Sequence, residues 1–138
     1  MFGFFSKRKR ARLLIVDDEP SIIDPLKERL ETSGYEVVTA SNGQQGLIRA
    51  VKYVPQLIIL DTNMPYMDGP EMLERLRENP DLRHTAVIML TACRTIENLD
   101  RTDKLRVEDY VTKPFDTHDL ITRIEKVLIK NGILEPAY

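Results

Sequence analysis

The feature that most constrains the fold of this chain is a short apolar run ending on one carboxylate, Leu57-Ile58-Ile59-Leu60-Asp61. An unbroken apolar run of this length is typical of a strand covered on both faces inside a parallel sheet. Met64-Pro65 follows closely, so we expect the strand to end at Asp61 and the chain to turn there. Ligands of open parallel sheets bind beyond the carboxyl ends of the strands, which puts Asp61 where a reactive side chain would stand.

Similar strand patterns alternate with helical patterns along the rest of the chain. The other predicted strands cover residues 13–16, 35–40, 86–90 and 110–114. Apolar residues at helical spacing predict four helices. Their buried faces are expected to consist of Ile22 or Ile23, Leu26 and Leu30; of Leu47, Ala50, Val51 and Val54; of Met72, Leu73 and Leu76; and of Leu120, Ile121, Ile124, Val127 and Leu128. Residues 95–105 are polar, so a helix there would be marginal.

Pro25 interrupts the first helical pattern, which leaves two alternatives. The helix begins at Pro25 with Asp24 as its N-cap, or it begins earlier and kinks at Pro25. In either case, with the marginal helix at 95–105 counted, the order of elements is strand and helix, five times. Right-handed crossovers then predict an α/β fold, a flavodoxin-like (βα)5 doubly wound parallel sheet of five strands in the order 2-1-3-4-5.

Composition limits the class of protein. A chain of 138 residues, 42% hydrophobic and 30% charged, predicts one globular domain, which we expect to cover residues 11–130. The single cysteine excludes an internal disulfide and favours a cytoplasmic location. Apolar runs of membrane-spanning length and a signal peptide are absent. Residues 1–10 predict a basic N-terminal tail and residues 131–138 a short C-terminal tail.

Polar side chains stand at four of the predicted strand ends: Asp17 and Asp18, then Asp61, Thr91 and Lys113. In the strand order 2-1-3-4-5 the first and third strands are neighbours, so the three aspartates should share one pocket. Carboxylates this close need a cation or a raised pKa, and oxygen ligands with room for water suit Mg²⁺. A lysine and a hydroxyl suit phosphoryl oxygens, and a carboxylate can accept a phosphoryl group. The set predicts phosphoryl transfer to Asp61.

Four blocks carry a resemblance to a known family. They are Leu13-Leu14-Ile15-Val16-Asp17-Asp18-Glu19-Pro20, Asp61-Thr62-Asn63-Met64-Pro65-Tyr66-Met67-Asp68-Gly69, Met89-Leu90-Thr91-Ala92 and Asp109-Tyr110-Val111-Thr112-Lys113-Pro114-Phe115. Their order and separation resemble the response-regulator receiver domain of two-component signalling. The resemblance implies that Asp61 is the phosphoacceptor of a histidine kinase or histidine phosphotransfer protein.

The resemblance also implies roles for individual residues. Asp18 and Asp61 would bind Mg²⁺ through their side chains, Asn63 through its backbone carbonyl and Asp17 through water. Thr91 and Lys113 would contact the phosphoryl group, and Tyr110 would act with Thr91 as a conformational switch. Asn63 and Cys93 would tune the lifetime of the aspartyl phosphate. In one departure from the usual pattern, Arg106-Val107 stands where a Gly-Ala turn commonly precedes the last strand.

Partners and activity are expectations at this stage. With no output domain after residue 130, we expect a stand-alone receiver that docks to a downstream target, binds no DNA and is not an enzyme beyond its own phosphorylation and dephosphorylation. Dimerisation on phosphorylation and weak membrane-surface contact by residues 1–12 are further hypotheses. Two alternatives are a pure interaction module and an Asp-nucleophile phosphatase of the haloacid-dehalogenase type. The phosphatase needs an aspartate two residues after the nucleophile, where Asn63 stands.

Overall fold

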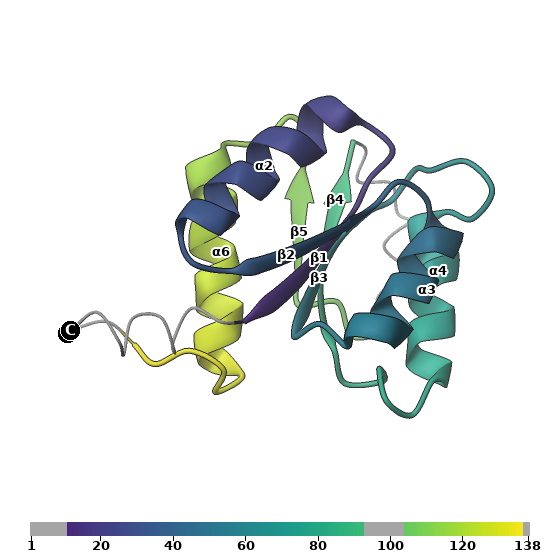
Figure 1. The fold of residues 1–138 in the computed structure, drawn as a ribbon. Helices are drawn as coiled ribbons and strands as arrows, with labels where there is room; N and C mark the ends of the chain where they lie inside the picture. Colours follow the sequence, from purple (N-terminus) through teal and green to yellow (C-terminus); the bar gives the residue numbers. More distant parts are fainter. Residues whose placement is uncertain (1–10, 93–103, 137–138) are drawn as a thin grey trace.

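The computed structural model describes residues 11–92 and 104–136 (Figure 1). It contains one parallel sheet of five strands in the order β2-β1-β3-β4-β5, as the sequence predicts. The strands are β1 (Arg12–Val16), β2 (Glu36–Ala40), β3 (Leu57–Asp61), β4 (Ala86–Thr91) and β5 (Asp109–Thr112). The described helices are α2 (Pro20–Thr32), α3 (Gly43–Tyr53), α4 (Gly69–Glu78) and α6 (Thr117–Lys130). The predicted flavodoxin-like α/β fold is confirmed.

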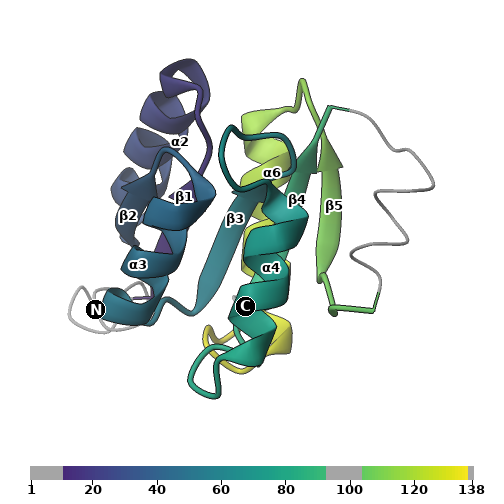
Figure 2. The same ribbon diagram turned by 90° about the vertical axis from the view of Figure 1, so that its right-hand side faces the viewer.

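Two hydrophobic cores cover the two faces of the sheet. Alternate residues of β1 point to opposite faces, so Leu13 and Ile15 belong to one core and Leu14 and Val16 to the other. Helices α2 and α6 cover the first face, and α3 and α4 cover the second (Figures 1 and 2). All five residues of β3 are buried. This double coverage explains why the central strands read as unbroken apolar runs.

Helix α2 begins at Pro20 and continues through Pro25, so of the two alternatives the late start with Asp24 as N-cap is wrong and the earlier start is confirmed. Proline is tolerated in a first helical turn because the first N–H groups have no acceptor within the helix. Pro25 lies further along, on the exposed side of the helix. Its neighbours Ile23, Leu26 and Leu30 form the buried face, as predicted.

The predicted buried face of α3 is partly wrong. Val51 and Val54 are 56% and 52% exposed, whereas Gly43, Gly46 and Ala50 are buried. A Cβ added to Gly46 would lie 2.8 Å from the Met72 sulfur. The helix therefore approaches the sheet and α4 closely through small residues, which leaves Val51 exposed, whereas Leu47 is partly buried against the core as predicted.

The other predicted segments differ in smaller ways. Strand β5 begins one residue earlier and ends two residues earlier than predicted. The buried face of α6 consists of the five predicted residues. Leu134, in the predicted C-terminal tail, is 8% exposed and packs into the core under α2 and α6. Residues 1–10 and most of the polar segment 95–105 lie outside the described residues. Within the described part of the chain, no helix has the length and apolar composition to cross a membrane.

Candidate functional site

The predicted site residues lie at the carboxyl ends of the strands. Asp17 directly follows β1, Asp61 ends β3 and Thr91 ends β4. Lys113 directly follows β5, and its backbone N–H donates to the Thr91 carbonyl over 2.9 Å. Strands β1 and β3 are paired neighbours from which the chain winds toward opposite edges of the sheet. The fold therefore gathers these side chains at its topological switch point.

The ammonium group of Lys113 connects three carboxylates. Its Nζ atom lies 2.8 Å from Asp17 Oδ2, 3.0 Å from Glu19 Oε1 and 3.3 Å from Asp61 Oδ1. The side chains of Lys113, Asp17 and Asp61 are 12%, 0% and 6% exposed. Lys113 precedes a cis peptide bond to Pro114. One partly buried cation therefore neutralises part of the charge of the buried Asp17 and Asp61 carboxylates.

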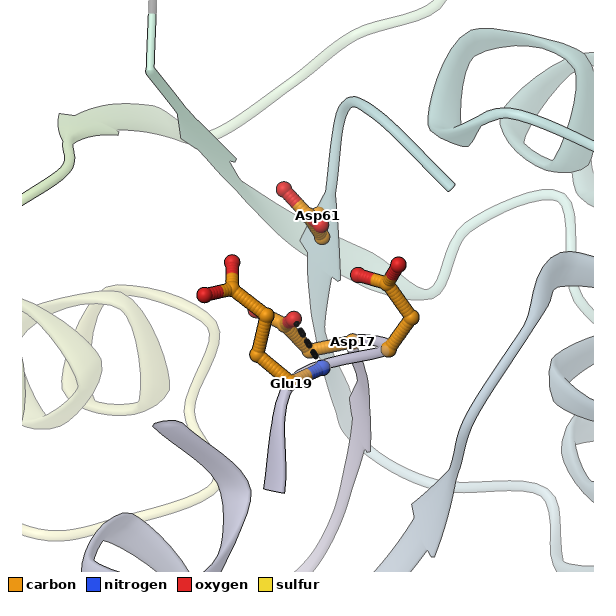
Figure 3. Close-up of side chains that lie close together, drawn as sticks. Asp17, Glu19 and Asp61 are labelled. Carbon is orange, nitrogen blue, oxygen red and sulfur yellow. Dashed lines mark hydrogen bonds between the residues drawn. The ribbon is translucent and has the colours of Figure 1, made fainter. Parts of the chain in front are cut away.

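Four carboxylates form this acidic cluster: Asp17, Asp18, Glu19 and Asp61. One oxygen from each lies within 4.8 Å of the others. Figure 3 shows Asp17, Glu19 and Asp61 close together, with the Glu19 N–H donating to Asp17 Oδ1 over 2.9 Å. No role was predicted for Glu19 from the sequence. Its place directly after Asp17-Asp18 is the signal that could have pointed to it.

Burial and neighbouring charge change the acidity of the site. Burial, followed by repulsion from Asp17, raises the pKa of Asp61 from 3.8 to about 6, although Lys113 and the Asn63 backbone N–H oppose this rise. Burial alone would lower the pKa of Lys113, but the close carboxylates of Asp17, Glu19 and Asp61 raise it well above its usual value. The cluster thus keeps an excess of negative charge that Lys113 alone does not neutralise.

The donor set fits a divalent cation that prefers oxygen. Carboxylate oxygens are the ligands of Mg²⁺, which also keeps several waters. Asp17 Oδ2 is buried, and apart from its ion pair with Lys113 it accepts no aligned hydrogen bond from a described group. Asp18 and Glu19 are exposed, so the cluster is open to solvent on one side. These residues could hold Mg²⁺ with part of its water shell.

The loop after β3 packs tightly under Asp61. A Cβ added to Gly69 would lie 2.3 Å from the Asp61 carbonyl oxygen, a distance that no real side chain tolerates. The Gly69 N–H also donates to the Thr62 carbonyl over 2.9 Å. Asp68 caps α4 by accepting from the Glu71 N–H over 2.9 Å. The start of α4 therefore holds the end of β3, and with it Asp61, in place.

The remaining predicted site residues differ in burial and in position relative to the acidic cluster. Thr91 is 4% exposed at the end of β4, one position beyond Leu90, which pairs with Asp61. Tyr110 is half-buried in β5 and packs against the core under α3 and α4. The Asn63 side chain is exposed. Cys93 lies outside the described residues, so its predicted role stays a prediction.

The raised pKa of Asp61 predicts a stability difference that depends on pH. The folded state binds this proton more tightly than the unfolded state, so ionisation of Asp61 costs stability as pH rises from 3.8 to about 6. We expect Asp61→Asn and the wild type to have the same free energy of unfolding near pH 4, measured with urea in EDTA. Above pH 7 the variant should be more stable by about 2–3 kcal/mol. Equal stabilities of the two proteins at pH 8 would contradict the prediction that ionisation of Asp61 destabilises the fold.

Residues 13–125 match the protein family described as "Response regulator receiver domain". The "Probable transcriptional regulator ycf27" of Porphyra purpurea is 42% identical over 124 residues, which are 88% of this chain and 49% of that protein. This chain therefore spans about half the length of such curated relatives.

Solved structures of similar proteins superpose on this chain over nearly their whole length. The chemotaxis protein CheY4 of Vibrio cholerae is 33% identical with a TM-score of 0.81, covering 86% of this chain and 99% of that one. A CheY-like response regulator receiver domain protein from Methanospirillum hungatei is 31% identical with a TM-score of 0.84, covering 90% and 98%. The likeness therefore includes both the fold and the sequence.

Proposed function

This chain belongs to the family of response regulator receiver domains, and from that premise we propose that it takes up a phosphoryl group on Asp61. The donor would be the phosphohistidine of a histidine kinase or histidine phosphotransfer protein. The observation that carries this proposal is the buried Asp61 carboxylate, 3.3 Å from Lys113 and within a cluster of oxygen ligands. A nucleophile and a cation for phosphoryl oxygens thus lie side by side.

The proposed step is a transfer between two nucleophiles. A carboxylate oxygen of Asp61 attacks the phosphorus, and the new P–O bond forms as the P–N bond to the donor imidazole breaks. The imidazole nitrogen keeps the electron pair of the broken bond. Lys113 would shift from its carboxylate partners toward the phosphoryl oxygens, and the Thr91 hydroxyl would donate to one of them. Bound Mg²⁺ would supply positive charge beside the transferring oxygens.

We propose the metal ligands that the sequence predicts, and we add a role for Glu19 toward Lys113. Asp18, Asp61 and the Asn63 carbonyl would bind Mg²⁺ directly, and Asp17 through water. Glu19 would hold Lys113 before the phosphoryl group arrives, because its carboxylate lies 3.0 Å from the ammonium group. Tyr110 with Thr91 would report phosphorylation to a docking surface. We expect no turnover of other substrates.

The test is chemical phosphorylation of the purified chain. Incubation with acetyl phosphate and Mg²⁺ should add one phosphoryl group, detected by intact-mass spectrometry and mapped to Asp61 after borohydride reduction. EDTA should reduce the modification to the level of a sample without phosphodonor, because the acidic cluster then repels the phosphoryl oxygens. Absence of any modification at saturating Mg²⁺ would favour the pure interaction module instead.

The partners of the phosphorylated form belong to the same proposal. The ycf27 relative is named a transcriptional regulator, and this chain matches about half of it. We propose that the present domain acts in the cytoplasm through a protein target and binds no DNA itself. Phosphorylation-dependent dimerisation and weak membrane contact by residues 1–12 remain hypotheses. A pull-down that compares beryllofluoride-treated and untreated protein tests for a state-dependent target.

A further inference from the structure

A second charged pocket, of opposite sign, opens at the other end of the sheet. Its volume is about 370 Å³, and it lies where β4 begins and where the chain enters β5. Among the lining residues are Arg77, Arg83, His84, Arg106 and Glu108. The acidic site lies at the carboxyl ends of the strands, whereas this pocket lies at their amino ends. The two sites are therefore separate.

Backbone carbonyls hold the guanidinium group of Arg77 in place. Its Nε donates to the Leu105 carbonyl over 2.7 Å, and its Nη2 donates to the Arg106 carbonyl over 3.0 Å. Its Nη1 donates to the carbonyls of Thr85 and Arg83 over 2.7 and 3.1 Å. Arg77 thus ties the end of α4 to the segment before β5 without using a carboxylate.

Arg106 brings a second guanidinium group to the same place. Its Nη2 donates to the Arg83 carbonyl over 2.7 Å, so that oxygen accepts from both Arg77 and Arg106. Its Nη1 lies 3.4 Å from His84 Nδ1. Burial and then the charge of Arg106 lower the pKa of Arg77. Two cations are therefore held close enough to repel each other.

The described carboxylates balance these cations only in part, since the charge of Glu108 opposes but does not cancel the lowering of the pKa of Arg77. Within residues 11–92 and 104–136, no ion pair includes Arg77, Arg83 or Arg106. By contrast, Arg123 pairs with Asp109 over 2.9 Å. The acid in the pocket wall, Glu108, is 3.4 Å from Lys130. The pocket therefore has an excess of positive charge.

The backbone conformation of Arg106 independently supports a role for its side chain. Its φ of 60° lies in the left-handed region, where a residue with a Cβ is strained by about 1 kcal/mol and glycine is not. A charged side chain therefore stands where glycine would be less strained, and that side chain points its donors at the pocket wall formed by Arg83 and His84.

From this arrangement we propose that the pocket binds an anion that carries a phosphate or diphosphate group. Guanidinium groups match phosphate oxygens because they offer planar, paired N–H donors. Among the described residues the Arg83 side chain makes no hydrogen bond, so the guanidinium groups of Arg83 and Arg106 would donate to the phosphate oxygens. Arg77 would act as a positioning residue, because its donors are already engaged. A bound anion would also relieve the repulsion between Arg77 and Arg106.

The experiment is a titration of the ¹⁵N-labelled full chain with inorganic pyrophosphate, in Mg²⁺-free buffer, followed by NMR. We expect saturable shifts of the Thr85, Ala86 and Asn131 amides, which line the pocket or adjoin it. Arg83→Ala should weaken binding about tenfold or more, because it removes a charged hydrogen-bond donor. This substitution keeps the Arg83 carbonyl that anchors Arg77 and Arg106, so the fold should persist. Arg106→Gly should also weaken binding, and glycine suits its backbone.

Arg75→Ala is the matched control, since Arg75 is an exposed arginine of α4, two residues before Arg77, that pairs with Glu71 over 3.3 Å. It removes the same charge and should leave pyrophosphate binding unchanged. Equal weakening by Arg75→Ala and Arg83→Ala would overturn the proposal, as would shifts that do not saturate or that lie elsewhere. Binding to phosphatidylglycerol vesicles tests whether the phosphate group belongs to a soluble ligand or to a lipid headgroup. Vesicle binding that is unaffected by Arg83→Ala indicates a soluble ligand, and vesicle binding that this variant weakens indicates a lipid headgroup.

Discussion

Replacing Asp61 with asparagine should abolish phosphorylation of this domain. Asparagine keeps the shape of the side chain but its amide oxygen is a poor nucleophile, so no stable acyl phosphate can form. With acetyl phosphate and saturating Mg²⁺, we expect the modified fraction to fall to that of a sample without phosphodonor. Intact-mass spectrometry of the wild type and the variant, treated in parallel, measures this loss.

Asp81→Asn provides the control for this experiment. Asp81 is exposed after α4, in a part of the chain away from the strand ends that form the acidic cluster. Its substitution changes the net charge equally and should leave phosphorylation at the wild-type level. Because Asp61→Asn should be as stable as the wild type or more stable, loss of labelling would not reflect unfolding. Undiminished labelling of Asp61→Asn would refute Asp61 as the acceptor.

Replacing Lys113 with methionine should destabilise the domain more than any other substitution proposed for the acidic cluster. Methionine keeps much of the volume but removes the cation that lies within 3.3 Å of three carboxylates. Removing one partner of a buried ion pair typically costs about 3–5 kcal/mol. Glu19 is more than half exposed, so most of this cost comes from the buried Asp17 and Asp61 carboxylates. We expect a loss of about 3 kcal/mol at pH 8 in EDTA, measured by urea unfolding.

The pH dependence of this loss follows from the signs of the shifts. Because the pKa of Lys113 is raised, the stability that it contributes is present throughout the range below its ordinary pKa of 10.5. The variation between pH 5 and 8 therefore comes from Asp61, which is mostly protonated below its pKa of about 6. The cost of Lys113→Met should be smaller at pH 5 than at pH 8. Added Mg²⁺ should restore part of the stability by replacing the lost positive charge.

Lys126→Met is the control for the lysine substitution. Lys126 is exposed on α6, and no ion pair includes it among the described residues. Its loss should change stability by no more than about 0.5 kcal/mol. If Lys113→Met were no more destabilising than Lys126→Met at pH 8, the acidic cluster would not depend on Lys113 for its charge balance.

The strands and their polar ends could be predicted because local sequence carries that information. Leu57–Leu60 is apolar at every position since both faces of β3 are covered, and this pattern is visible without a structure. The buried face of α6 could also be predicted, because its large apolar residues recur at ordinary helical spacing. Asp17, Asp61, Thr91 and Lys113 stand directly at or after strand ends, so the strand order alone brings them to one edge.

Other features depend on how closely elements approach each other. In α3, Gly46 lies against Met72 and Val16, and Val51 is exposed. Periodicity assigns the core side of a helix by its large apolar residues, but a helix that packs closely uses its small ones. Glycine contributes no hydrophobic signal, so the face of α3 could not be read from the pattern.

By itself, the sequence determined the five-stranded parallel order and the acidic character of the site at the carboxyl ends of the strands. The tertiary structure decided which charges meet. It brings Lys113 within 3.0 Å of Glu19, a residue 94 positions away that the sequence analysis left without a role. It also decided the burial that raises the pKa of Asp61 and the meeting of Arg77 with Arg106 at the opposite edge. Charge interactions act over a few ångströms through space, and sequence separation does not specify such distances.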